Sequence, residues 1–504
     1  MEQYELPDGW VWATLGEVTK PTSQMNPADM PDRVFKYVDI SSIDSRRNEI
    51  ATHKEVLGSE APSRARKPIE AGDILFSTVR TYLRNVAVVP PKYDGEIAST
   101  GFCVLRTHEE IDPRFVFYHL LTESFIQKIS EKQRGISYPA VTDRDVYAEV
   151  VPLAPSAEQL RIVEKIEALF EQSRTAREAL DAIPALLRRF RQAVLAAAFR
   201  GELSTRDPDD EPASALLERI LEERRRRWEE NLRAKGKDPR RYTYPEPAPP
   251  DTRGLPELPE GWCWATVEQL GAIDEQAVLT GPFGSNLSRD DFVDTGVPVL
   301  TIGCLTEQGI MLDKAFYVSE EKAVELARYR VQQNDILFSR MASVGRADMV
   351  PGDIEGSIIN YHLMRLRLHR SAIDPKFFVF YVRGSTNVTD YLRKINHGIT
   401  RDGINTQQLL KLPVALAPKA EQRAIVSRVQ SLFAQADIVE VAAELARRRL
   451  DRLDQSILAR AFRGELVPQD PNDEPASVLL ERIRAEKARR AGERTSRRRN
   501  KGRK

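Results

Sequence analysis

Arginine, hydroxyl and aromatic side chains gather in four short segments, two in each half of the 504-residue chain. In the first half these are residues 78–84, which follow a short apolar run, and residues 134–138, which include a glycine. Their counterparts in the second half are residues 340–346 and 397–401. Arginine can pair bidentately with guanine or bind phosphate, and hydroxyls contact phosphates or base edges. The segments therefore predict contacts to DNA, although each arginine alone also fits a solvated or salt-bridged surface position.

The candidate DNA-binding side chains of the first half are Thr78, Arg80, Tyr82, Arg84, Arg134, Ser137 and Tyr138. Those of the second half are Arg340, Ser343, Arg346, His397, Thr400 and Arg401. Arginines occur at corresponding places in the two halves. This correspondence favours DNA contacts over unrelated surface arginines.

Patterns that would give the chain catalytic chemistry of its own are missing from the sequence. The six histidines are scattered, and no His-Glu-x-x-His, Cys-x-x-Cys or Gly-x-Ser-x-Gly pattern occurs. The segment Gly281-Pro282-Phe283-Gly284-Ser285 lacks the Gly-x-x-x-x-Gly-Lys pattern of a nucleotide-binding loop. The Asn/Asp-Pro-Pro-aromatic tetrapeptide of amino-methyltransferases is also missing. We therefore expect no catalytic residue, metal site or bound cofactor in this chain.

Charge is balanced overall but unevenly distributed. There are 75 basic and 75 acidic residues, and residues 1–155 and 252–418 carry net charges of −5 and −3. Without a broad positive field, DNA affinity should depend on a few focal contacts. Residues 484–504 hold 11 basic and 2 acidic side chains. They predict a disordered basic tail that either touches nucleic acid or is merely solvated.

Cysteine usage and hydropathy bear on the compartment. Cys103, Cys263 and Cys304 show no disulfide or metal spacing, which suits a reducing cytosol. No apolar run of about 18 residues and no signal peptide are found. The sequence thus predicts a cytoplasmic protein without a membrane segment.

The segments must be positioned by a scaffold, and the sequence shows one as a repeat. Residues 157–220 recur 263 positions later as residues 420–483, with Ala-Phe-Arg-Gly-Glu-Leu at 198–203 and again at 461–466. In both copies apolar residues alternate steps of four and three over more than 30 residues, which predicts two long helices that pair through an a/d seam. Two unrelated surface helices are the alternative. Pro184 should kink the first helix or remove one hydrogen bond.

The predicted pairing residues are Ile162, Ile166, Leu169, Leu180 and Leu187 in the first helix, and Ile425, Val429, Leu432, Leu450 and Leu453 in the second.

The remaining sequence gives the domain organisation. Short β-type runs separated by Gly, Pro and Asp turns fill residues 1–155 and 251–418, and both stretches open on Leu-Pro-x-Gly-Trp. We therefore expect an α+β protein with two β-rich domains, 1–155 and 251–418, separated by two long antiparallel, coiled-coil-like helices of an internal repeat. The helical segments are 156–250, which ends in a Pro-rich linker, and 419–483, with the tail at 484–504.

These motifs resemble the specificity subunits of type I restriction-modification systems. The resemblance covers nearly the whole chain apart from the tail. It is carried by the Leu-Pro-x-Gly-Trp openings, Gly/Asn-Asp-Ile-Leu-Phe-Ser, the Pro-x-x-Glu-Gln helix starts, the repeated Ala-Phe-Arg-Gly-Glu-Leu, and residues 281–287, Gly-Pro-Phe-Gly-Ser-Asn-Leu. Ser285 and Asn286 of the last motif join the candidate DNA-binding residues.

The resemblance implies two target-recognition domains, each reading one half of a bipartite site in double-stranded DNA, with the helices setting the spacer. It implies no active site in this subunit. Two methyltransferase subunits and endonuclease/translocase subunits would assemble on it, and S-adenosylmethionine, ATP and Mg would bind to those partners. The alternatives are a DNA adenine methyltransferase subunit, which should show the missing tetrapeptide, and a structural coiled-coil adaptor, which leaves the arginine-bearing domains unexplained.

Overall fold

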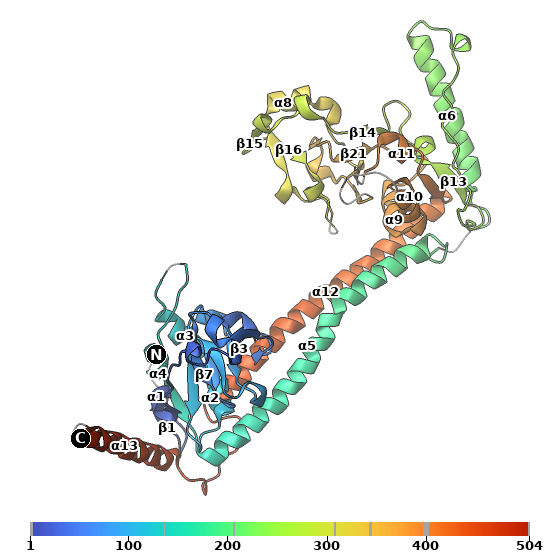
Figure 1. Ribbon diagram of the computed structural model, residues 1–504. Coiled ribbons are helices and arrows are strands. Elements are labelled where there is room, and N and C mark those ends of the chain that lie inside the picture. Colours follow the sequence, from blue (N-terminus) through green and yellow to red (C-terminus); the bar gives the residue numbers. More distant parts are fainter. Residues whose placement is uncertain are drawn as a thin grey trace. The chain divides into compact units, whose positions relative to one another are not determined.

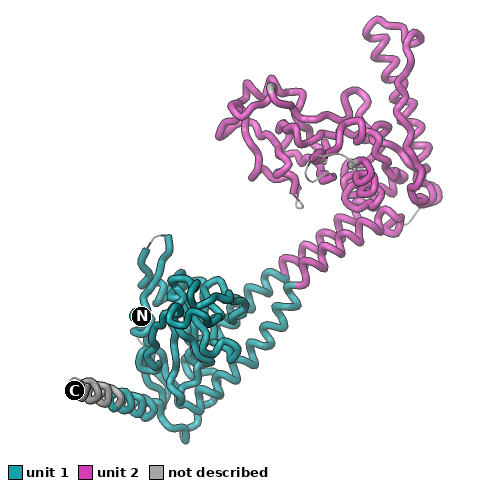
Figure 2. Tube along the Cα trace, in the orientation of Figure 1, with its two compact units in different colours: residues 1–181, 443–504 teal, residues 182–442 magenta. Residues whose placement is uncertain are grey.

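The computed structural model describes residues 4–135, 137–204, 207–306, 309–341, 345–396 and 403–501 (Figure 1). For Ser285, Asn396 and residues 490–501 it describes the backbone alone. The chain divides into two compact units, unit 1 (residues 1–181 and 443–504) and unit 2 (residues 182–442) (Figure 2). The units therefore cut across the predicted segments, because each long helix contributes one part to each unit.

Unit 1 begins with β1 (Val11–Thr14), which pairs antiparallel with β12 (Val150–Leu153). One sheet has the order β6 (Lys54–Leu57), β3 (Val34–Val38), β10 (Glu96–Ser99) and β7 (Ala65–Ile69). A second has the order β2 (Thr19–Lys20), β11 (Phe102–Thr107), β8 (Ile74–Ser77) and β9 (Val86–Val88), and β4 (Ile43–Asp44) pairs with β5 (Glu49–Ile50). The short helices are α1 (Leu15–Val18), α2 (Pro113–Leu120), α3 (Glu123–Glu131) and α4 (Asp143–Tyr147).

Unit 2 follows the same plan. Strand β13 (Cys263–Thr266) pairs with β22 (Pro413–Leu416). The sheets have the orders β14 (Val278–Thr280), β21 (Leu363–Leu366), β18 (Ile336–Ser339), β19 (Ala347–Met349), and β15 (Phe292–Val293), β17 (Phe316–Val318), β16 (Val297–Leu300), β20 (Ile358–Ile359). Its shorter helices are α6 (Ala213–Ala234), α7 (Val267–Leu270), α8 (Glu320–Glu325), α9 (Pro375–Gly384), α10 (Thr386–Asn396) and α11 (Thr406–Leu410). The predicted α+β class is confirmed.

The repeated Asp-Ile-Leu-Phe-Ser motif forms the buried strands β8 and β18. All four residues of each strand are buried, as expected for a continuous apolar run. The preceding Asp73 and Asp335 are also buried. Each carboxylate accepts a bidentate pair of hydrogen bonds from an arginine, Arg106 at 2.8 Å and Arg367 at 2.6–2.7 Å. The pairing compensates the buried charge and fixes the turn before the strand.

The other repeated motifs attach each β-rich domain to a long helix. The indole Nε1 of Trp10 donates to Glu158 at 3.0 Å, and that of Trp262 donates to Glu421 at 2.9 Å. The adjacent Gln159 accepts from the backbone N–H of Asp112 at 3.1 Å, and Gln422 makes the matching bond to Asp374 at 2.8 Å. In each unit, the tryptophan of the Leu-Pro-x-Gly-Trp motif therefore bonds the glutamate of the Glu-Gln motif.

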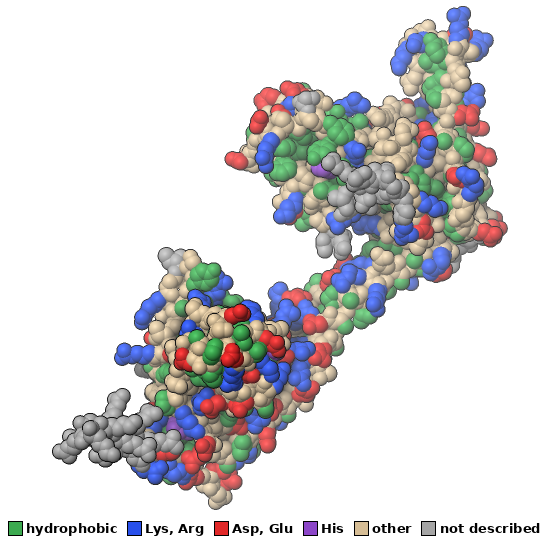
Figure 3. All heavy atoms as spheres, viewed as in Figure 1, with side chains coloured by type: hydrophobic (Ala, Val, Ile, Leu, Met, Phe, Trp, Pro, Cys, Tyr) green, Lys and Arg blue, Asp and Glu red, His purple; other side chains and the backbone are tan. Residues whose placement is uncertain are grey.

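Helices α5 (Ser156–Ala198) and α12 (Lys419–Ala461) have 43 residues each and pair antiparallel. In unit 1 Arg177 bonds Asp454 at 2.6 Å, and in unit 2 Arg191 bonds Glu440 at 3.0 Å. Figure 3 shows basic and acidic side chains intermixed along both helices. Helix α5 runs through Pro184 without a break. Both helices stop before a glycine with positive φ, Gly201 (75°) and Gly464 (73°), as the C-cap conformation requires.

The seam agrees with the prediction at most positions. Ile162, Ile166, Leu187, Ile425 and Val429 are buried, whereas Leu169, Leu180, Leu432 and Leu450 are partly buried.

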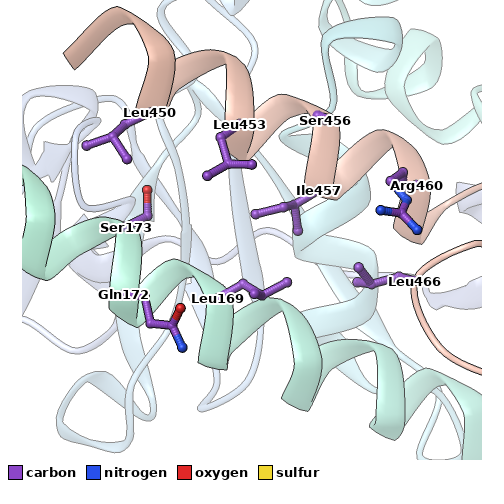
Figure 4. A pocket seen from close by; sticks show the side chains of 9 residues that line it. All are labelled: Leu169, Gln172, Ser173, Leu450, Leu453, Ser456, Ile457, Arg460 and Leu466. Carbon is purple, nitrogen blue, oxygen red and sulfur yellow. The ribbon is translucent and has the colours of Figure 1, made fainter. Parts of the chain in front are cut away.

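Leu453 is the exception among the predicted pairing residues, because it is 50% exposed. It lies at a cavity of about 350 Å³ in unit 1 (Figure 4). Across the seam stand Gln172 and the short Ser173. Ser173 turns its hydroxyl to Asp454 at 2.7 Å instead of packing on an apolar neighbour. Leu169 of α5 lines the same cavity.

In each unit one core joins the β-rich domain to three helices. In unit 1 this core includes Ile162 of α5, Ile457 of α12 and Leu479 of α13 (Ala476–Lys501). In unit 2 it includes Val194 of α5 and Ile425 of α12, together with Leu216 of α6. The helices are therefore integral to the domains, and their burial stabilises both.

Residues 484–501 of the predicted tail, which we expected to be disordered, belong to α13. Arg484 bonds Glu17 at 2.6 Å, and the Lys487 ammonium donates to the carbonyls of Gly16 and Glu17 at 2.7 and 2.9 Å. A lysine suits this place because it faces the carbonyl end of α1. The net charge of this segment did not predict its structure, because Arg, Lys, Glu and Ala are good helix formers.

Candidate nucleic-acid interface

The two candidate segments of unit 1 lie side by side. Residues 78–84 follow β8, and the backbone N–H of Arg80 donates to the carbonyl of Pro139 at 2.8 Å. Val79 and Ala140 form an antiparallel bridge, and Ala140 pairs further with Arg134. Arg80 adopts a left-handed conformation with φ of 49°, which is uncommon for a non-glycine residue. The backbone thus brings the two loops together, as a shared DNA-contact surface requires.

Arg80, Ser137 and Tyr138 form a cluster on these loops. The Arg80 guanidinium lies 5.2 Å from the centre of the Tyr138 ring, a cation–π arrangement, and its Nη2 donates to the Ser137 carbonyl at 3.3 Å. Tyr138 is 72% exposed, and Tyr82 on the neighbouring turn is 52% exposed. Arg80 has no carboxylate at ion-pair distance among the described residues. It is free to donate to a phosphate or a guanine.

Two candidates of unit 1 are structural instead. Thr78 is buried, and its hydroxyl donates to the carbonyl of Gly101 at 2.9 Å. Arg84 forms an ion pair with Glu123, and its carbonyl accepts from Asn48 at 2.9 Å. Arg134 remains exposed, 4.0 Å from Asp145. Neither Thr78 nor Arg84 is therefore presented for binding.

In unit 2 part of the predicted surface lies outside the described residues. This applies to Ser343, His397, Thr400 and Arg401, and to the side chain of Ser285. Asn286 is exposed at the end of the 3-10 turn Gly284–Asn286, and Arg346 is exposed after β18. Arg346 donates its backbone N–H to the Ser339 hydroxyl at 3.0 Å.

Arg340 lies in an aromatic cluster. Its guanidinium is 5.4 Å from the centre of the Phe283 ring, and its Nη1 donates to the Tyr361 carbonyl at 3.4 Å. The Phe283 and Tyr361 rings are 6.0 Å apart, and Tyr361 contacts the His362 ring with centres 3.8 Å apart. Phe283 and Tyr361 are 55% and 41% exposed. Burial and the neighbouring Arg340 charge hold the pKa of His362 below its usual value, so this ring is neutral at pH 7.

Phe283, Tyr361 and His362 are functional candidates that the sequence prediction missed. The available signal was an aromatic residue between two glycines. At Gly281 a Cβ atom would collide with the backbone of Asn360. Glycine is therefore needed for the 281–286 loop to approach residues 360–362.

The loops of the two units correspond, but their arginines do not. Thr78 donates its N–H to the Gly101 carbonyl and accepts from Val141, both at 2.9 Å. Arg340 makes the same two bonds with His362 and Ile404, at 3.1 and 2.9 Å. Arg340 is therefore the counterpart of Thr78. By the same criterion Arg346 corresponds to Asn85. The Arg346 carbonyl accepts from the backbone N–H of Ser339, and the Asn85 carbonyl accepts from that of Ser77.

Other kinds of site are not found in the described part of the chain. No group of three or more His, Cys, Asp or Glu residues there is arranged to hold a metal ion. No described helix combines the length and apolar character needed to cross a membrane.

Comparison with known proteins decides the family. The model of the type I restriction modification DNA specificity domain matches residues 284–444. The EcoDI type I restriction enzyme specificity subunit of Escherichia coli is 30% identical over 397 residues, which cover 76% of this chain and 79% of the relative. The chain belongs to the type I restriction enzyme specificity subunits.

Further relatives agree with this assignment. The StySPI specificity subunit of Salmonella potsdam is 30% identical over 80% of this chain and 78% of its own length. The solved HsdS subunit from Thermoanaerobacter tengcongensis is 30% identical, with 92% of this chain and 98% of that chain covered and a TM-score of 0.54. A chain from a structure on complex assembly and conformational transition of the type I R-M system is 29% identical over 92% of this chain and all of that chain, with a TM-score of 0.67. The family resemblance predicted from the motifs is confirmed.

Proposed function

We propose that this specificity subunit reads a bipartite site in double-stranded DNA, one half with each unit. The supporting observation is that both units present an arginine held over an exposed aromatic ring on corresponding loops, Arg80 over Tyr138 and Arg340 over Phe283. Such arginines have donors available for guanine or phosphate. Because residues 1–155 and 252–418 are net negative, the chain alone should bind DNA weakly and with strong salt dependence.

The proposal extends to the assembly. Two methyltransferase subunits and endonuclease/translocase subunits bind this chain and carry out methylation and cleavage in the cytoplasm. S-adenosylmethionine, ATP and Mg bind to those partners. This chain supplies recognition and no catalytic residue.

Methylation mapping tests the proposal. Adenine methylation is mapped across the genome of the source strain and of a strain that lacks this gene. We expect a bipartite motif that disappears with the gene and returns with the wild-type copy. Arg80→Ala should then change base preference in one half of the motif only. Identical methylation in the two strains would contradict the proposal.

A binding measurement addresses the alternatives. The purified chain should show no tight S-adenosylmethionine binding by calorimetry, and it should recover methyltransferase subunits when it is pulled down from its host. A 1:1 micromolar complex with S-adenosylmethionine would favour the DNA adenine methyltransferase alternative. Pull-down without any methyltransferase would favour the structural adaptor.

A further inference from the structure

Unit 2 has a four-residue cluster that unit 1 lacks at the corresponding positions. Arg340, Phe283, Tyr361 and His362 come from three segments. The guanidinium lies over the Phe283 ring, which neighbours the Tyr361 ring, and Tyr361 in turn contacts the His362 ring. The counterparts of Arg340 and His362 in unit 1 are Thr78 and Gly101, which bond each other and hold no cation or ring. The two units therefore present different chemistry from the same backbone framework.

The charge of Arg340 is available for a ligand. No carboxylate lies within ion-pair distance of it among the described residues, whereas Arg383 and Arg367 of the same unit are paired with Asp348 and Asp335. The nearby His362 is neutral at pH 7 and does not compete for an anionic or dipolar partner. A guanidinium with one face on a ring presents its N–H donors edge-on.

We propose that Arg340 reads a guanine in the half-site of unit 2 and that Phe283 is a positioning residue for it. The edge of a guanidinium matches the N7 and O6 acceptors of guanine in the major groove. Phe283 lies under the guanidinium and so restricts the positions that it can take. Unit 1 reads its own half-site with Arg80, which lies two residues after the counterpart of Arg340. This inference rests on the proposed function and assigns the base that one side chain reads.

The test is selection from a DNA library with both half-sites randomised, using the full chain assembled with its co-expressed methyltransferase subunits. The wild-type complex should select a guanine at a defined position of one half-site. Arg340→Ala removes the donors that would pair with O6 and N7, so preference for that guanine should fall by about tenfold or more. Phe283→Leu should reduce the same preference, and Phe283→Tyr should retain it. Arg80→Ala is the matched control, and its effect should appear in the other half-site.

A modified base separates base reading from general weakening. Replacing the selected guanine with 7-deazaguanine removes the N7 acceptor, so wild-type affinity should fall by about tenfold. The Arg340→Ala complex should bind the two duplexes with affinities within about twofold. An unchanged half-site in each variant also reports that the complex is folded.

The experiment distinguishes failure of the proposed function from failure of the Arg340 assignment. If wild type selects no bipartite sequence, the proposed function fails and this inference falls with it. If wild type selects a bipartite site but Arg340→Ala selects the same guanine with unchanged preference, the assignment of Arg340 is overturned and the proposed function stands. A 7-deazaguanine penalty that is equal in wild type and variant would overturn it as well.

Discussion

His119 and Tyr381 occupy corresponding positions in the two units, and each donates a side-chain hydrogen bond to a backbone carbonyl. The Nε2–H of His119 donates to the Val150 carbonyl at 3.1 Å, and the Tyr381 hydroxyl donates to the corresponding Pro413 carbonyl at 2.9 Å. Both side chains are buried. Burial lowers the pKa of His119 to about 4, because no water stabilises its charged form.

This histidine makes the stability of unit 1 depend on pH. In the unfolded chain His119 protonates near pH 6.5, above its folded pKa of about 4. The stability it contributes is therefore complete above about pH 6.5 and is lost as the pH falls toward 4. Between pH 7.5 and 5 the loss should be roughly 2 kcal/mol. Chemical denaturation at both pH values measures it.

The chain supplies its own control, because Tyr381 shows that tyrosine can bond the same carbonyl. His119→Tyr should remove this part of the pH dependence, whatever its effect at pH 7.5. The reciprocal Tyr381→His should introduce a similar dependence in unit 2. Equal pH dependence of wild type and His119→Tyr would contradict the assignment.

At this scale the sequence predicted residue types better than residue roles. Arg80 and Arg340 could be named as candidates because arginine in a loop after a strand is a local feature. The burial of Thr78 and the ion pair of Arg84 depend on Gly101 and Glu123, which are distant in sequence. Thr78 and Arg340 each directly follow the repeated Asp-Ile-Leu-Phe-Ser motif, and their backbone hydrogen bonds show the same correspondence.

Between α5 and α12 the charged pairs follow the repeat with their signs exchanged. Arg177 of α5 faces Asp454 of α12 in unit 1, and at the positions 263 residues away Glu440 of α12 faces Arg191 of α5 in unit 2. Helix α5 therefore has the cation in both pairs and α12 the anion. Pairing of α5 with a second α5 would bring Arg177 against Arg191. The charges thus favour the pairing of α5 with α12.

Exchanging the charges of unit 1 for those of unit 2 tests this explanation. Arg177 also pairs with Asp451, whose counterpart is Arg188. Arg177→Glu alone should lower the free energy of unfolding by about 1 kcal/mol, because it places three acids together at a partly exposed site. Adding Asp451→Arg and Asp454→Arg places a Glu–Arg pair like that of Glu440 and Arg191 at this site and should restore most of that loss. Urea denaturation of the single and triple variants is the measurement. A triple variant less stable than the single one would show that the sign of each pair is fixed by other contacts.

The heptad pattern predicted these two helices because their spacing repeats over more than 30 residues. It could not predict that Ser173 would bond Asp454, since a serine at a seam position fits either an apolar or a polar interface. It also could not predict the exposure of Leu453. Which side chains contact each other across a seam depends on the tertiary structure and cannot be deduced from the heptad pattern of one helix.

For the whole molecule, sequence order predicted the repeat but not the units. Residues 1–155 share a core with Phe462 and Leu479, which lie more than 300 positions later. The ring of Phe462 is 5.1 Å from that of Phe115 and also contacts His119. The repeated Ala-Phe-Arg-Gly-Glu-Leu predicted two equivalent exits from the helices. It did not predict that each copy of this motif would pack on the β-rich domain other than the one that precedes its helix.

Both long helices continue from one unit into the other, so their length should determine the spacer between the half-sites. Deleting residues 178–184 from α5 and residues 441–447 from α12 removes one heptad from each. The deletion preserves the seam phase. It also preserves the Arg177–Asp454 and Arg191–Glu440 pairs, while Asp181 and Arg447, which bond each other, leave together. Each helix becomes about 10 Å shorter.

If the helices act as a ruler along the DNA, the preferred spacer should shrink by about three base pairs, because one turn of about 10.5 pairs spans roughly 34–36 Å. Three pairs also rotate one half-site by roughly 100° around the duplex, so a fixed DNA probe is a poor test. Selection from a library of spacer lengths, with the half-sites kept, is therefore the measurement. Deleting seven residues from α5 alone is the control. It leaves one heptad of α12 without facing residues on α5 and should impair folding. A folded double deletion that selects the parental spacer would show that the helix length does not set it.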